Sequence, residues 1–409
     1  MPDMPGMKMA GHSMRRARAT LIDRLEMHST SGTDAEPNSS PTEMLMSSAG
    51  AWTFMFHGEA FLNDIQQSGS RGRDRWFSAN WFMPMAQREL GEGTLTLRLM
   101  FSLEPATVTD RRYPELFQQG ETAFGVPVVD GQHPHDLFME LAALYDHRLG
   151  EKTLLSLYAA PMGDPALGPV AYPHRASASE DPLAALGHHL QDSTHIAADV
   201  ITVGLTHRNL RLEASGFHGR EPDENRWNIN SGKLDSWSVR STVNFHENWS
   251  GQFSLGQLHS PEALAPQEDI RRITASVAYN RPLRNGNWAA LLLWGRNQSL
   301  LDGNVGNGYL VESTLQFAHR NAAWGRIENV DRTNELFLGE NPEPAGFSER
   351  YFTRVQAYTL GYDRELGHIP HVSTAVGEQF TWYGVPAELK AAYGGHPVGG
   401  VMFLRVRLH

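Results

Sequence analysis

Large apolar side chains alternate with polar ones along most of this chain. In residues 52–62, Trp52, Phe54 and Phe56 share one parity, whereas His57 and Glu59 share the other. Successive side chains of an extended strand point to opposite faces, so this pattern predicts a strand with one apolar and one polar face. The same alternation recurs in residues 94–103, 136–146, 210–219, 236–246, 272–280, 309–317 and 401–409.

The links between these segments alternate in length. Short links fall near residues 89–92, 148–151, 207–208, 247–248, 282–286, 320–321 and 365–369. Long links fall near residues 63–75, 104–135, 161–194, 220–234, 260–270, 298–307, 332–351 and 383–397. A soluble β-sandwich is the alternative, but nothing in that fold requires short and long links to alternate. The pattern therefore predicts an all-β, closed antiparallel transmembrane β-barrel of about 16 strands, with short periplasmic turns and long extracellular loops.

The two faces of such a barrel meet different surroundings. The apolar face, which includes Leu97, Leu141, Val243 and Val277, is expected to contact lipid. Tryptophans near predicted strand ends fit the aromatic girdles of the membrane interface, namely Trp52, Trp237, Trp249, Trp288, Trp324 and Trp382. The polar face is expected to line the lumen with His57, Glu59, Arg98, Arg211, Glu213, Arg240, Arg272, Glu312, Arg326, Glu328, Arg405 and Arg407.

Composition narrows the classes of function. The 409 residues contain no apolar run of the length that a transmembrane helix needs, and no cysteine that could form a disulfide or a thiolate metal site. The net charge of −11, without a basic stripe, argues against binding to nucleic acid. Glycine-rich phosphate loops and the G-x-S-x-G and H-E-x-x-H motifs are missing from the sequence, so we expect no enzymatic activity.

Residues 1–50 differ from the rest of the chain. They are rich in Ser, Thr, Asn and Pro, a composition that buries too little apolar surface to offset the entropy of ordering. We therefore expect a flexible extension over residues 1–50 and a barrel domain over residues 51–409. Arg15, Arg16 and Arg18 are not followed by an apolar segment, so a signal peptide is not visible in the sequence.

The first residues carry soft metal ligands at regular spacing, namely Met4, Met7, Met9, His12 and Met14. Thioethers suit Cu(I), and this spacing in a polar segment is not a core pattern. The segment predicts copper capture. The alternative is a tail in which the methionines bind nothing.

A second candidate metal site lies between Gly131 and His195, a stretch that holds seven of the 19 histidines. Imidazole and carboxylate groups bind divalent metals. The alternative is a polar plug in which these groups satisfy one another. The candidate ligands are His133, His135, Asp136, Glu140, His174, His188, His189, Asp192 and His195.

In size and hairpin plan, residues 50–409 resemble the outer-membrane β-barrels of Gram-negative bacteria, porins in particular. The segments His-Pro-His-Asp at 133–136 and Pro-His-Arg-Ala-Ser-Ala-Ser at 173–179 are similar to those of a barrel family without an assigned function. The Met/His-rich tail is similar to segments of periplasmic copper-resistance proteins. The third extracellular loop of porins enters the lumen and sets its constriction, so the resemblance implies the same for residues 161–194.

These observations favour an outer-membrane channel for small polar solutes or ions, surrounded by lipid and present as a monomer or a trimer. A binding or resistance protein for copper or another divalent metal, anchored in the outer membrane, is the alternative. A third hypothesis is a lipid hydrolase, because Ser177, Ser179 and Ser193 lie near His174 and His195 in the sequence.

Overall fold

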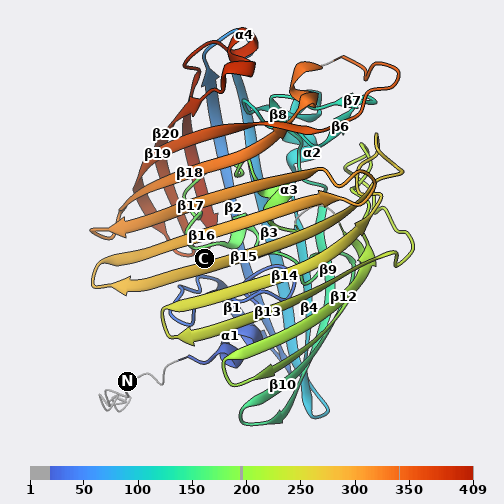
Figure 1. The fold of residues 1–409 in the computed structure, drawn as a ribbon. Helices are drawn as coiled ribbons and strands as arrows, with labels where there is room; N and C mark the ends of the chain where they lie inside the picture. The colour runs from blue at the N-terminus through green and yellow to red at the C-terminus, as the bar shows by residue number, and fades with distance from the viewer. Residues whose placement is uncertain (1–18, 194–196, 340, 409) are drawn as a thin grey trace, which may run out of the picture.

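The computed structural model describes residues 19–193, 197–339 and 341–408. Within these residues, sixteen antiparallel strands form a closed barrel whose ring closes between β21 and β2 (Figure 1). The predicted fold class and strand number are therefore confirmed. The wall strands are β2 (Trp52–Gln67), β3 (Arg75–Leu90), β4 (Gly93–Phe101), β9 (Phe138–Gly150), β10 (Thr153–Met162), β11 (Ala198–His207), β12 (Leu210–His218), β13 (Ser236–His246), β14 (Trp249–His259), β15 (Asp269–Leu283), β16 (Gly286–Ser299), β17 (Val305–Phe317), β18 (Asn321–Thr333), β19 (Tyr351–Ile369), β20 (Val372–Gly384) and β21 (Val398–Leu408).

The two ends of the barrel differ, as the alternating links predict. At one end, here called the turn end, tight turns such as 91–92, 151–152 and 208–209 join neighbouring strands. At the opposite end, here called the loop end, the longest connections are residues 102–137 and 163–197. Each wall strand pairs with the next one along the chain, so the whole wall is built from hairpins.

Short elements fill the loops. The helices are α1 (Leu21–Met27), α2 (Glu104–Thr107), α3 (His188–Gln191) and α4 (Lys390–Tyr393), and the 3-10 turns are η1 (Thr109–Arg111), η2 (Tyr172–His174), η3 (Asn334–Phe337) and η4 (Ala387–Leu389). The short strands are β1 (Leu45–Ala49), β5 (Tyr113–Pro114), β6 (Thr122–Ala123), β7 (Val126–Pro127) and β8 (Gly131–Gln132). No helix in the described part of the chain is long and apolar enough to cross a membrane.

The outward face of the wall is apolar. Leu97 and Val277 are 43% and 38% exposed, and Leu141 and Val243 are half-exposed on the same outer face. An exposed apolar surface around the whole wall would be unstable in water but is stable in lipid. This surface identifies the barrel as a membrane-spanning one.

An aromatic series marks the turn end of the outer surface. Phe245 stacks on Trp249, which packs against Tyr279, which in turn packs edge-on against Trp288. This arrangement matches the aromatic girdle that barrel proteins place at a membrane interface. Trp324 is an exception to the prediction, because it lies on the inward parity of β18 and is only 4% exposed.

The N-terminal segment corrects the predicted extension. Residues 19–49 are built into the barrel, while residues 1–18 lie outside the described part of the chain. The helix α1 begins with a capping box between Thr20 and Asp23 and packs Leu25 against Leu154 of the wall. Strand β1 pairs with the turn-end half of β2. Polar composition does not keep this segment unfolded, because the inner wall supplies the hydrogen-bonding partners that water would otherwise provide.

Candidate functional site

Two inserts lie inside the barrel, and residues of the loop 102–137 join them at its loop end. One is the N-terminal segment, residues 19–44, and the other is the described part of the third loop, residues 163–193 and 197, which carries α3 (Figure 1). The side chains predicted to line the lumen all lie on the inward face of the wall, and all but the half-buried Arg407 are buried. They are His57, Glu59, Arg98, Arg211, Glu213, Arg240, Arg272, Glu312, Arg326, Glu328, Arg405 and Arg407.

A buried ion pair on the wall holds the N-terminal segment. The Arg98 guanidinium donates to both carboxylate oxygens of Glu140, at 2.6 and 2.8 Å. It also donates to the backbone carbonyls of Thr30 and Gly32. Glu140 accepts in return from the Gly32 N–H at 2.9 Å and from the Tyr158 hydroxyl at 2.8 Å. Glu140 is thus committed to anchoring the segment, which does not match its predicted role as a metal ligand.

A second group of anchors lies on β13. Arg240 pairs with Asp34 of the N-terminal segment and donates to the Thr33 hydroxyl at 3.0 Å. Asn244 donates to the backbone carbonyl of Glu36 at 3.1 Å. These bonds and those of Arg98 fix the polar stretch that follows α1.

The third loop is attached to the inner wall in the same manner. Arg175 donates to Glu312 at 2.8 Å, and Asp181 pairs with Arg326 at 3.0 Å. Ser177, a serine of the hydrolase hypothesis, also donates to Glu312 at 2.8 Å. Its hydroxyl therefore faces the lumen instead of lipid.

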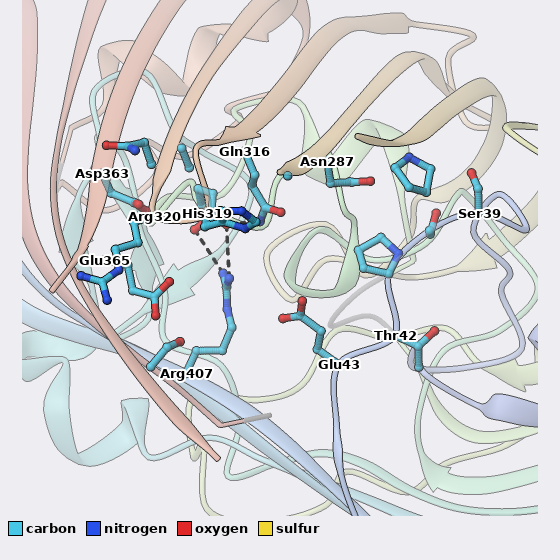
Figure 2. A pocket seen from close by; sticks show the side chains of 18 of the residues that line it. Ser39, Thr42, Glu43, Asn287, Gln316, His319, Arg320, Asp363, Glu365 and Arg407 are labelled. Atoms are coloured by element: carbon cyan, nitrogen blue, oxygen red, sulfur yellow. Dashed lines mark hydrogen bonds and ion pairs between the residues drawn. The ribbon is translucent and has the colours of Figure 1, made fainter. Parts of the chain in front are cut away.

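A cavity of about 1000 Å³ remains at the turn end, between the N-terminal segment and the wall (Figure 2). Glu43 of the segment and Arg407 of β21 both project into it (Figure 2). Arg320 and Glu365 line it as well. Because its charged groups carry both signs, the cavity suits hydrated ions and small polar molecules better than apolar ones.

Histidines from two loops meet near the loop end of the lumen. His133 follows β8 in the loop 102–137, and His188 and His189 lie on α3. One ligand atom from each of the three imidazoles falls within 4.8 Å of the others. Glu121 approaches the same group, with its Oε1 at 3.0 Å from His133 Nε2 and 3.9 Å from His189 Nε2. We call these four residues the histidine cluster.

Backbone contacts orient two of the rings. The Nδ1 of His133 lies 2.8 Å from the Pro134 carbonyl, and the Nδ1 of His188 lies 2.7 Å from the Ala185 carbonyl. An Nδ1–H that donates to the Ala185 carbonyl leaves the lone pair of His188 on Nε2, as in many metal-binding histidines, whereas Nε2 of His133 faces the Glu121 carboxylate. Burial lowers the pKa of His188 well below its ordinary value, which keeps this imidazole neutral and able to coordinate a metal.

The third imidazole approaches a glycine. Gly120 has a φ of +108°, and a Cβ at this position would lie 2.7 Å from His189 Nδ1. Any side chain here would both strain the backbone and displace the ring. Burial also lowers the pKa of His189 to about 3.

An acidic cavity of about 100 Å³ adjoins the histidine cluster at the loop end. Glu121, Glu221, Glu262, Glu335 and Glu349 line it, and ligand atoms of Glu121, His189 and Glu221 lie within 4.8 Å of one another. Burial, and then the charge of neighbouring carboxylates, raises the pKa of Glu221, of Glu262 and of Glu335 well above the ordinary range. Carboxylates crowded in this way favour a cation between them.

The nine predicted ligands of the histidine-rich stretch therefore do not form one site. Asp136 pairs with Arg226 at 3.3 Å, and His135 Nδ1 lies 2.8 Å from Glu104. The backbone carbonyl of Asp192 accepts from Arg272 at 2.6 Å.

The remaining predicted ligands lie elsewhere. His174 contacts the wall near Met100. His195 and the tail ligands Met4, Met7, Met9, His12 and Met14 lie outside the described residues.

Sequence reasoning missed Glu121 and Glu221. Neither lies in a motif, and each belongs to a different loop from the helix α3 that it faces. The only local signal is Gly120, which permits the close approach of His189.

No protein-family model and no curated protein sequence matches this chain. Solved structures with the same fold include an anion-selective porin from Comamonas acidovorans, which is 11% identical with a TM-score of 0.54 over 87% of this chain and 100% of the porin. They also include OmpF of Salmonella typhi in complex with daunomycin, which is 9% identical with a TM-score of 0.50 over 89% of this chain and 100% of that one. At these identities the similarity establishes the fold alone.

The closed sixteen-stranded wall, its apolar outer face and these structural neighbours define the class of the protein. It is a transmembrane β-barrel with the fold of the outer-membrane porins.

Proposed function

We propose that this barrel is an outer-membrane channel for small polar solutes or ions. The observation that carries the proposal is the charged lumen, which keeps a cavity of about 1000 Å³ beside the inserts. A wall of this size encloses an aqueous passage unless something fills it. Here the N-terminal segment and the third loop fill it, so passage requires one of them to move.

The N-terminal segment is the better candidate for the moving part. Apart from the apolar contact of α1 with Leu154, it is attached to the wall by hydrogen bonds and ion pairs. It leads into β1, which pairs with β2 beyond the C-terminal end of β21. The third loop is held at both ends by wall strands, β10 and β11. A segment held by polar contacts can exchange them for water at lower cost than a segment packed in an apolar core.

A reversible cross-link tests this proposal. Ser39 of the segment donates to the backbone carbonyl of Asn280 on β15 at 2.7 Å, and the chain has no native cysteine. We expect the variant Ser39→Cys/Asn280→Cys to conduct poorly in planar bilayers when oxidised and to recover when reduced. The native chain, treated with the same reductant, is the control. If the fully cross-linked, oxidised variant conducted as well as the reduced variant, movement of the segment would be refuted. If neither variant nor the native chain conducted at all, the channel would be refuted.

Binding of a divalent metal is a second candidate function, supported by the convergence of His133, His188 and His189. Imidazole nitrogens with a carboxylate suit Zn²⁺, Ni²⁺ or Cu²⁺. When the detergent-solubilised proteins are titrated with Zn²⁺, we expect His188→Ala/His189→Ala to bind one equivalent fewer than the native chain. The variant His259→Ala, which removes an exposed histidine on β14, should bind as the native chain does. Unchanged binding in the double variant would rule out this site.

A further inference from the structure

A methionine cluster lies on the inner wall, between the two inserts and the strands β2, β3 and β4. It consists of Met55, Met83, Met85 and Met100, each at most 2% exposed, with Met44 and Met139 packed at its edge. Most inward positions of this wall carry charged, hydroxyl or amide groups. Thioethers on the inner face do not stabilise the barrel in lipid, because lipid contacts the outer face of the wall.

Two histidines lie at this methionine cluster, one placed by strand register and one by the third loop. Met55 lies directly opposite Met85, and His57 lies directly opposite Met83 in the pairing of β2 with β3. Side chains opposite each other in an antiparallel pair have Cβ atoms about 5 Å apart. His174 of the third loop adds a second ring, at a centroid distance of 5.5 Å from His57.

The distance between His174 and the nearest thioether fits shared coordination. His174 Nε2 lies 3.4 Å from the sulfur of Met100. Nitrogen and sulfur ligands bound to one four-coordinate ion lie roughly 3.5 Å apart, given bond lengths of about 2.0 and 2.3 Å. The two atoms are therefore spaced as ligands of one ion would be.

A buried nitrogen points to a missing ligand. His57 is 8% exposed, and its Nε2 has no hydrogen-bond partner among the described residues. A buried polar atom without a partner costs about 1–3 kcal/mol. Trp81 packs against both imidazoles, at centroid distances of 5.1 and 4.6 Å, and so closes the site on one side. A bound cation would use the nitrogen that the protein leaves unsatisfied.

We propose that His57, His174, Met83 and Met100 bind a soft monovalent cation, Cu(I) or Ag(I). Thioether and imidazole ligands are soft and neutral, which suits a soft ion of single charge. A divalent ion would bring a second charge into a buried site whose ligands supply no negative charge to offset it. The inference does not rest on conduction, because the site belongs to the wall and the third loop.

The site adjoins the cavity at the turn end. A small cavity of about 130 Å³ is lined by His57, Trp81 and His174, and it shares Glu43 and Arg407 with the large turn-end cavity. An ion in the large cavity therefore lies next to the cavity that His57 and His174 line.

The test uses the full chain in detergent. The tail methionines are changed by Met4→Leu, Met7→Leu, Met9→Leu and Met14→Leu, so that copper bound by the tail does not add to the copper bound at this site. Cu(I) is supplied with a chromogenic competing chelator, and Ag(I) is supplied as its nitrate. Against this background, Met83→Leu/Met100→Leu preserves side-chain volume but removes two sulfurs. The matched control is Met402→Leu, which removes an exposed methionine from the outer face of β21.

We expect Met83→Leu/Met100→Leu to weaken binding of one Cu(I) equivalent by roughly tenfold or more, since even the loss of an indirect partner costs a metal site 10–100-fold. X-ray absorption of the bound copper should show sulfur neighbours in the background chain and in Met402→Leu, and none in the double variant. Equal affinity in all three chains, or a bound ion without sulfur neighbours, would overturn the proposal. If the double variant does not fold, as judged by its heat-dependent electrophoretic mobility, His174→Gln on the third loop replaces it, with the same two outcomes.

Discussion

Arg98 and Glu140 both bind the N-terminal segment. Their hydrogen bonds give the free energy that this pair contributes to docking of the segment. The proposed perturbation is Arg98→Met/Glu140→Leu, which removes both charges and so does not leave an unpaired charge in the wall. Three hydrogen bonds are lost: those of the Thr30 carbonyl, the Gly32 carbonyl and the Gly32 N–H. A hydrogen bond to a charged partner contributes about 1.5–3 kcal/mol, so the loss is roughly 4–5 kcal/mol at the lower end of that range.

A loss of this size raises the population of the undocked segment by roughly a thousandfold, at about 1.4 kcal/mol for each factor of ten. Hydrogen–deuterium exchange of residues 28–40 should accelerate by a similar factor while exchange of the wall strands stays slow. The same variant should conduct more than the native chain in planar bilayers. The control is Arg354→Met/Asp331→Leu, which removes an ion pair of 2.6 Å between β18 and β19 near the loop end.

Native exchange rates over residues 28–40 in Arg98→Met/Glu140→Leu would refute the reasoning. Such a result would mean that Arg240 and the other anchors hold the segment without help from Arg98. Faster exchange without a gain in conductance would instead separate docking of the segment from control of the passage.

Three further predictions follow from single sites. A Cβ at Gly361 would lie 2.1 Å from the Trp324 ring, so Gly361→Ala should lower the temperature of the electrophoretic mobility shift, whereas Gly367→Ala, with open space around it, should not. Burial raises the pKa of Asp164 from 3.8 to about 7, so ionisation of its carboxyl opposes folding progressively as the pH rises from about 4 to 7. Asp164→Asn should therefore stabilise the barrel against urea at pH 8 and not at pH 4. An equal effect at both pH values would contradict this prediction. A peptide of residues 1–14 should bind Cu(I) more tightly than its methionine-to-leucine version, and equal affinities would remove the proposed role of the tail.

The alternation of side chains determined the wall by itself. A period of two is a local property, so each strand's inward and outward residues can be read without knowing its neighbours. This is why Arg98, Arg240 and Glu312 could be expected inside the lumen and Leu97 outside. The alternation of link lengths then determined the hairpin plan, because a short link forces neighbouring strands to pair.

Only the tertiary structure decided what fills the lumen. The N-terminal segment looks unfolded in sequence because its partners are distant: Thr30 meets Arg98, and Ser39 meets Asn280. Composition measures how much apolar surface a segment can bury, but it carries no information about polar partners elsewhere in the chain. A polar segment can therefore be ordered wherever the fold presents a polar wall to it.

The candidate sites divide in the same way. Ligand chemistry was visible in sequence for His133, His188 and His189, but their grouping with Glu121 depends on where two loops cross inside the barrel. At the methionine cluster, sequence parity gives each residue an inward direction, whereas strand register sets His57 opposite Met83. Register and loop path arise from contacts between distant residues, and a period read along one strand cannot contain them.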